Sequence, residues 1–136
     1  MRTPQLGWGR CVTYFTMAAA LVLAGSGETI ATRVRWARSP TARVRGLLGG
    51  AALLAGEALV LEPAKQLHSF RMRYPLDVIF CDRDWDVRHV VRPLRPNRVT
   101  RWVAPARFGI EMRAGELAAN VTVGVRLTLS GSPFDP

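Results

Sequence analysis

The chain has 136 residues, of which 49% are hydrophobic, and it contains 9 prolines and 12 glycines. This length predicts a single domain that can bury a core, and the many prolines argue against a helical bundle. The formal net charge is +9, and arginine supplies 18 of the 19 basic residues because Lys65 is the one lysine. Since nucleic-acid surfaces more often mix both residues, this preference favours a bias in the coding sequence.

The N-terminal residues can be interpreted in three ways. Residues 11–24 are uncharged and mostly apolar, too short to span a bilayer but similar to the apolar region of a signal peptide. Alternatively, residues 20–23 and 29–36 form a hairpin around residues 25–27, which we favour. A true start at Met17 is the third interpretation. We therefore predict an N-terminal extension over 1–19, one domain over 20–129 and a tail over 130–136.

Cellular location follows from the same residues and from the cysteines. Cys11 and Cys81 have neither metal-binding nor redox spacing, which favours free thiols in a reducing compartment. We expect a cytoplasmic protein without an integral membrane span, with export through a signal peptide as the alternative.

Short strands with frequent turn signals follow along the chain. Ser39-Pro40 predicts the start of a short helix over 41–48, which the glycines of 46–50 end. We expect further strands at 58–61, 67–74, 76–81, 87–91, 99–103, 108–112 and 126–129, and one helical turn at 116–120. The pattern predicts a mainly β fold (β-rich α+β), a small sandwich or partly closed barrel of about seven or eight short strands with one or two short helices.

Residues 67–82, LHSFRMRYPLDVIFCD, form the most informative stretch. An extended conformation over 67–74 would place His68, Phe70, Met72 and Tyr74 on one face. Residues 76–81 are apolar on both faces except for Asp77, so they predict a central strand. A carboxylate there must accept backbone hydrogen bonds or pair with an arginine. We expect these side chains to be mostly buried: Phe70, Met72, Leu76, Val78, Ile79 and Phe80.

The same stretch carries a resemblance to a known family. Met72, Pro75, Leu76, Asp77, Phe80 and Asp82 resemble the signature of the domain-of-unknown-function 192 family. Residues 45–48, residues 58–61 and Glu111 with Gly115 match further elements, so the resemblance covers about residues 29–129. The chain departs from the family at Trp85, where glycine is usual, and at Val125, which replaces an acid. The resemblance implies a compact β-rich body and no established activity.

The first functional hypothesis is a non-enzymatic domain that binds a small ligand or another protein near His68, Arg73, Asp77 and Glu111. A structural role is the alternative for His68 and for His89, which lies between two valines. An enzyme that uses a carboxylate–histidine pair ranks last. We expect a monomer without a cofactor. We also expect no bound metal, because Val87 and Pro93 disrupt the calcium-loop pattern of residues 82–93. A solvated turn explains its three aspartates.

Arginine clusters provide the second hypothesis. Residues 33–45 and 92–107 each contain five arginines and no acid. An anion or nucleic-acid site would bring Arg95, Arg98, Arg101 and Arg107 together near Trp102. We favour the alternative, in which these arginines scatter over several solvated faces.

Overall fold

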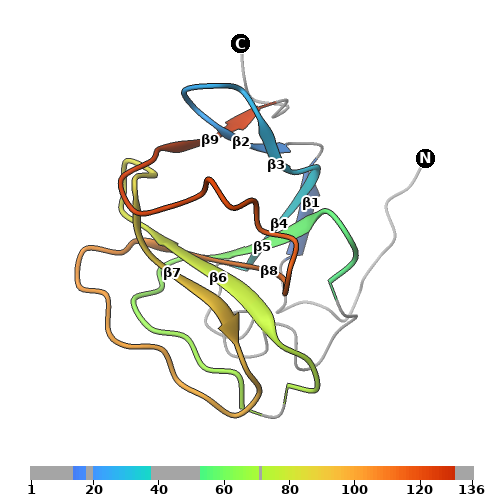
Figure 1. Cartoon of the computed structure of the whole chain (residues 1–136), viewed down its shortest axis with the longest axis vertical. Helices are drawn as coiled ribbons and strands as arrows, with labels where there is room; N and C mark the ends of the chain where they lie inside the picture. The colour runs from blue at the N-terminus through green and yellow to red at the C-terminus, as the bar shows by residue number, and fades with distance from the viewer. Residues whose placement is uncertain (1–13, 18–19, 38–52, 71, 131–136) are drawn as a thin grey trace.

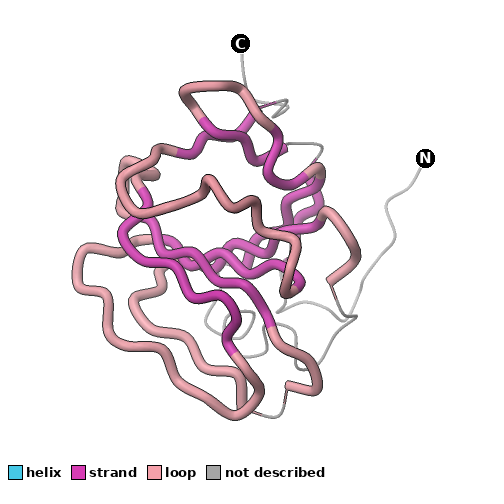
Figure 2. The backbone as a smooth tube through the Cα atoms, viewed as in Figure 1, coloured by secondary structure: helices cyan, strands magenta, loops and turns pink. Residues whose placement is uncertain are grey.

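A computed structural model describes residues 14–17, 20–37, 53–70 and 72–130. This part of the chain contains strands and no helix, and Figure 1 and Figure 2 show the strands surrounded by long loops. The strands are β1 (Tyr14–Met17), β2 (Ala20–Leu23), β3 (Thr29–Ala31), β4 (Arg33–Ala37), β5 (Glu57–Leu61), β6 (Leu76–Cys81), β7 (Val87–Leu94), β8 (Phe108–Arg113) and β9 (Leu127–Ser130). The predicted helix over 41–48 lies outside the described residues.

The strands form two sheets, which confirms the prediction of a mainly β, sandwich-like fold. The large sheet has the order β1-β4-β5-β8-β6-β7, and the small sheet has the order β3-β2-β9. Neither sheet closes into a barrel. In the large sheet β4 and β5 are parallel, whereas the other neighbouring strands are antiparallel.

Two apolar clusters lie on the two faces of the large sheet. One lies on the face that carries Trp36, Ile79 and Phe108, together with Leu21 and Leu127 of the small sheet. The other contains Leu59, Leu61, Val78 and Phe80 of the opposite face, together with loop residues such as Leu67. Strand alternation explains this division, because successive side chains point to opposite faces. Phe80 is fully buried, as predicted.

The hairpin predicted near the N-terminus is present as β2 and β3, but its second strand is shorter than expected. Thr32 interrupts the predicted strand 29–36, so that β3 joins the small sheet and β4 joins the large one. The interruption is fixed by Thr32, whose backbone N–H donates to the Gly56 carbonyl over 2.8 Å. β1 lies within the predicted N-terminal extension and pairs with β4.

Two predicted strands, 67–74 and 99–103, are loops. Their backbones pair with each other rather than with either sheet, and one isolated bridge joins His68 to Val99. Phe70 is therefore 47% exposed, contrary to the predicted burial, whereas Met72 is partly buried against the second apolar cluster. The helical turn predicted at 116–120 is also wrong, because that segment contains single turns without helical continuation.

β7 extends to Leu94 and includes Pro93, beyond the strand predicted over 87–91. A proline cannot donate a hydrogen bond within a sheet, so it is tolerated on an outer strand. β7 is such a strand, since it pairs with β6 on one side and ends the large sheet.

Candidate functional site

The four residues of the first hypothesis lie in three environments. Asp77 and Glu111 are buried on neighbouring strands, but Asp77 is opposite Met112 and Glu111 is opposite Val78. Their side chains therefore point to opposite faces of the large sheet. His68 and Arg73 are exposed on the loop after β5. The structure thus brings neither carboxylate together with His68.

Asp77 supports the loop that follows β8. One of its carboxylate oxygens accepts the backbone N–H of Gly115 over 2.9 Å and that of Leu117 over 3.2 Å. This confirms that Asp77 accepts backbone hydrogen bonds. A buried carboxylate that is bonded in this way fixes the chain turn after a strand.

Glu111 is buried between Leu59 of β5 and Val78 of β6. No described residue forms a hydrogen bond or ion pair with its carboxylate. Burial raises its pKa from 4.5 to about 7, because the charged form loses its hydration. Glu57, on the same face, differs because it accepts the Leu54 N–H over 2.9 Å and lies near two arginines.

The loops after β5 and β7 form a two-stranded ribbon, which Figure 1 shows at the end of the molecule away from the small sheet. We define the loop ribbon as residues 65–70 and 97–103. Four backbone hydrogen bonds of 2.8 Å join its halves: Ser69 to Arg98, Asn97 to Ser69, Thr100 to Leu67 and Val103 to Lys65, each N–H to carbonyl.

The inner side of the loop ribbon is anchored to the body of the protein. Leu67, Ser69, Thr100 and Val103 are buried. Leu67 also approaches Gly109 of β8 so closely that a Cβ atom at Gly109 would lie 3.0 Å from a Leu67 methyl carbon. The loop ribbon is therefore a packed structure with a defined outer face.

The outer face of the loop ribbon carries rings and an aliphatic side chain. Since Leu67 and Ser69 point inward, His68 and Phe70 point outward, and their rings stack at a centroid distance of 4.9 Å. Val99 lies directly opposite His68 and is 50% exposed. Trp102 is 60% exposed. His68, Phe70 and Val99 lie together, and exposed apolar groups that lie together indicate a binding surface.

Arginines on and beside the loop ribbon differ from most of those elsewhere in their pairing. Six arginines form ion pairs with acidic side chains: Arg33, Arg35, Arg88, Arg107, Arg113 and Arg126. Arg92 instead donates to the carbonyl groups of Leu117, Ala118 and Val121. By contrast, no described carboxylate pairs with five other exposed arginines: Arg83 in the turn between β6 and β7, and Arg73, Arg95, Arg98 and Arg101 on or beside the loop ribbon.

Three of the four arginines of the second hypothesis therefore lie on one loop with Trp102. Arg107 does not join them as a free charge, because its guanidinium bonds Glu62 over 3.1 Å. Arg101 lies near His89 of β7, and it adds to the effect of burial in lowering the pKa of that histidine. Residues 63–76 and 87–110, which include the loop ribbon, contain no acid.

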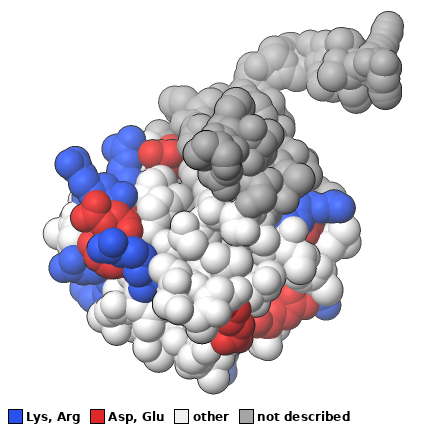
Figure 3. Space-filling model, turned by 90° about the horizontal axis from the view of Figure 1, so that it is seen from above, with Lys and Arg blue, Asp and Glu red and all other residues white. Residues whose placement is uncertain are grey.

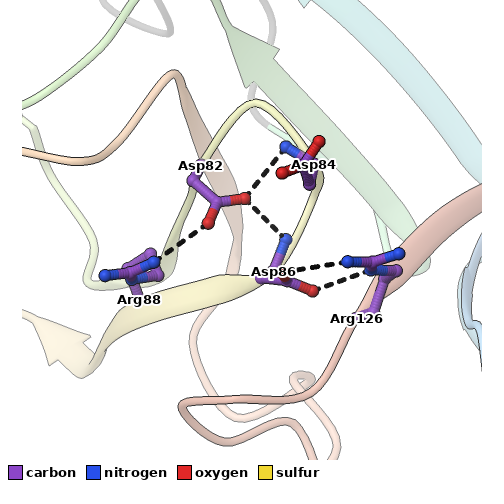
Figure 4. Close-up of polar contacts among 5 residues, drawn as sticks. All are labelled: Asp82, Asp84, Asp86, Arg88 and Arg126. Atoms are coloured by element: carbon purple, nitrogen blue, oxygen red, sulfur yellow. Dashed lines mark hydrogen bonds and ion pairs between the residues drawn. The ribbon is translucent and has the colours of Figure 1, made fainter.

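The acidic turn between β6 and β7 has a structural explanation. In Figure 4 one oxygen of Asp82 accepts the N–H groups of Asp84 and Asp86, over 2.9 and 3.0 Å. Arg88 pairs with Asp82, and Arg126 forms two hydrogen bonds with Asp86. Figure 3 likewise shows acidic and basic side chains intermixed at the margin of the molecule. These contacts agree with the predicted solvated turn.

The side chains that could support catalysis have other surroundings. Nδ1 of His68 accepts the Phe70 N–H over 3.2 Å, and His89 stacks on Phe80. In the described structure neither histidine bonds a carboxylate. Cys81 is buried, and burial together with Asp82 and Asp86 raises its pKa to about 12. A thiol with this pKa is a poor nucleophile at neutral pH, which agrees with a packing role.

A family model for DUF192, described as "Uncharacterized ACR", matches residues 21–129. The chain belongs to the domain-of-unknown-function 192 family. No curated protein matches the chain.

Two solved structures show that this DUF192 fold occurs elsewhere. One is a Sinorhizobium meliloti 1021 protein that has been proposed to be a transcription regulator, with a TM-score of 0.71 and 23% identity over 88% of this chain and 98% of that one. The other is a protein of unknown function from Novosphingobium aromaticivorans DSM 12444, with a TM-score of 0.65 and 17% identity over 94% and 99%. At these identities the similarity establishes the fold alone.

The departure from the family at Trp85 has a clear geometry. Trp85 has a φ of 67°, a conformation that favours glycine. Its ring stacks on Phe108 at 4.2 Å and meets Trp36 edge-on at 6.0 Å. Trp85 is therefore half-buried against the core, although it lies in a turn.

Sequence reasoning missed Phe70 and Val99 as surface residues. Alternating apolar residues indicate a half-buried strand, and nothing in that pattern distinguishes a strand from a ribbon that folds away from the sheet. The absence of acid over two long stretches was the available signal. In the part that the structure describes, no helix is long and apolar enough to cross a membrane.

Proposed function

We propose that this DUF192 chain is a non-enzymatic binding domain, that its binding surface is the outer face of the loop ribbon, and that its partner is negatively charged. One observation carries the proposal. Exposed rings occur on the loop ribbon, and arginines without a carboxylate partner lie on it or beside it. Six arginines elsewhere are paired with carboxylates.

The exposed apolar side chains of the loop ribbon favour binding of a partner. Among the described residues five large hydrophobic side chains are exposed, and Phe70, Val99 and Trp102 belong to the loop ribbon. A partner that covers them removes apolar surface from water. Interface centres are commonly enriched in aromatic residues and arginine, which is the combination found here.

The arginines supply the charge preference. Guanidinium groups that lack a neighbouring acid present uncompensated positive charge, which attracts an anionic partner. Of the first hypothesis, His68 belongs to this surface, and Arg73 lies three residues beyond the ribbon. Asp77 and Glu111 are buried in the body and do not belong to this surface, and Asp77 supports the loop after β8.

Retention of the full chain on immobilised heparin, a sulfated polysaccharide, tests the charge preference. We expect the chain to elute at a higher salt concentration than a variant that combines Arg98→Ala with Arg101→Ala. The matched control combines Arg113→Ala with Arg126→Ala, which removes the same charge from paired arginines. Equal losses of retention in both double variants would show that only net charge matters and would contradict the proposal.

A further inference from the structure

We infer that the partner of the loop ribbon is a single-stranded nucleic acid, whose bases stack on the exposed rings while its phosphates contact the arginines. This inference rests on the proposed function and names the chemical class of the partner. It makes a stronger claim than polyanion binding, because it requires the rings as well as the charges.

The rings fit unpaired bases. His68 and Phe70 form a stacked pair with an interplanar angle of 25°, and Phe70 remains 47% exposed. Trp102 exposes a second aromatic ring on the opposite half of the ribbon. Unpaired bases stack on such side chains with little dependence on sequence, whereas the bases of a duplex are already stacked on each other.

The arginines fit a phosphate backbone that passes along the ribbon. Arg95, Arg98 and Arg101 recur at every third residue of one loop, and Arg73 lies on the other loop. Arg101 is one residue from Trp102, and Arg98 precedes Val99. At Arg101 and Trp102 a charge therefore lies next to a stacking group, as a phosphate lies next to a base in a single strand.

Acidic proteins and duplex DNA fit the same surface less well. A carboxylate-rich peptide would pair with the arginines but would bring no flat apolar partner for three rings. A duplex would offer phosphates at its surface, and it would leave Phe70 and Trp102 exposed unless base pairs opened. Stacking thus selects the single strand.

Binding of a short oligothymidylate to the full chain, measured by fluorescence anisotropy across a salt series, tests the inference. We expect the logarithm of the affinity to fall with the logarithm of the salt concentration with a slope of about −3, for four phosphate contacts. The Arg98→Ala, Arg101→Ala double variant should reduce this slope to about half. Trp102→Ala should weaken binding at least about fivefold without changing the slope, because it removes stacking and keeps the charge.

Matched variants and competing ligands make the test decisive. Val123→Ala alters an equally exposed apolar residue away from the ribbon and should leave affinity unchanged. Circular dichroism should show that each variant is folded, and quenching of tryptophan fluorescence by the oligonucleotide should disappear in Trp102→Leu. Tighter binding of polyglutamate or of a duplex of equal length would overturn the inference. So would Trp102→Ala binding as tightly as the unaltered chain.

The two experiments can contradict the proposed function and the nucleic-acid partner independently. Heparin retention that depends on Arg98 and Arg101, without oligothymidylate binding, would preserve the anionic binding domain and remove the nucleic acid. Loss of the specific heparin effect would remove the proposed function itself.

Discussion

At the scale of single residues, Asp77 shows how one carboxylate organises a loop. The Asp77→Asn substitution keeps the size of the side chain but removes the charge that strengthens its bonds to Gly115 and Leu117. We expect the free energy of unfolding to fall by about 1–3 kcal/mol, measured by chemical denaturation. Asp84→Asn, at an exposed position in a turn, serves as the control and should change stability little. An unaltered Asp77→Asn variant would contradict the assigned role.

Glu111 has the opposite effect on stability, because no described group compensates for its charge. Its pKa is raised from 4.5 in the unfolded chain to about 7 in the folded protein, so the folded state binds the proton more tightly. Stability due to this group is complete below pH 4.5 and is lost as the pH rises towards 7. Above that pH the penalty is constant.

The Glu111→Gln variant tests this dependence on pH. The variant should be more stable than the unaltered chain at pH 8, with an upper limit of about 3 kcal/mol from the pKa difference, and the difference should shrink below pH 5. Thermal unfolding across this pH range measures it, with the exposed Glu28→Gln variant as control. A difference that does not depend on pH would show that a partner compensates the Glu111 charge.

At the scale of elements, Gly109 determines how closely the loop ribbon packs on the large sheet. A Cβ atom there would lie 3.0 Å from Leu67 and 3.1 Å from Ala64. Gly109→Val should therefore push the loop outward and cost about 1–3 kcal/mol of stability. Hydrogen exchange should then be faster at the Ser69 and Thr100 amides than at those of β6. Unchanged protection of both amides would show that the contact yields without moving the ribbon.

Whether an element was predicted correctly depended on which segment its backbone hydrogen bonds join. Residues 76–81 and 108–112 were predicted because a central strand is apolar on both faces or alternates strictly. The segments 67–74 and 99–103 have the same local pattern, yet their bonds join two loops. A single sequence shows the alternation of apolar and polar residues, but it does not show which segment the backbone pairs with. The predicted strand is therefore one side of the loop ribbon.

The candidate site was predictable only in part for the same reason. Arg95, Arg98, Arg101 and Trp102 are close in sequence, so their grouping was visible. Phe70 and Val99 are far apart in sequence, and only pairing of the two loops places them on one face. The separation of Asp77 from Glu111 depends on strand register, because a shift by one residue reverses the face of each side chain.

At the scale of the whole molecule, aromatic rings occupy the apolar cluster that includes residues of both sheets. Trp85→Gly would remove the stacking on Phe108 and would relieve the φ of 67° that favours glycine. Since loss of a large side chain typically costs more than the strain of one residue, we expect a net loss of about 2–3 kcal/mol. Denaturation followed by circular dichroism measures it.

Asp86→Asn provides the comparison for Trp85→Gly. It weakens the exposed ion pair with Arg126 and should cost less than about 1 kcal/mol. A larger cost for Asp86→Asn than for Trp85→Gly would mean that the exposed ion pair contributes more to stability than the packed rings.

Among the described residues no strand pairs with the outer side of β7, although Val87 exchanges backbone hydrogen bonds with Gly124 and Val125. This open edge has a consequence for behaviour at high concentration. Unpaired N–H and C=O groups along such a strand can template the addition of a second chain and lead to aggregation. Along β7 the charge of Arg92 and the missing donor of Pro93 oppose that addition. The strand that ends the sheet is therefore also its protection against fibrillar growth.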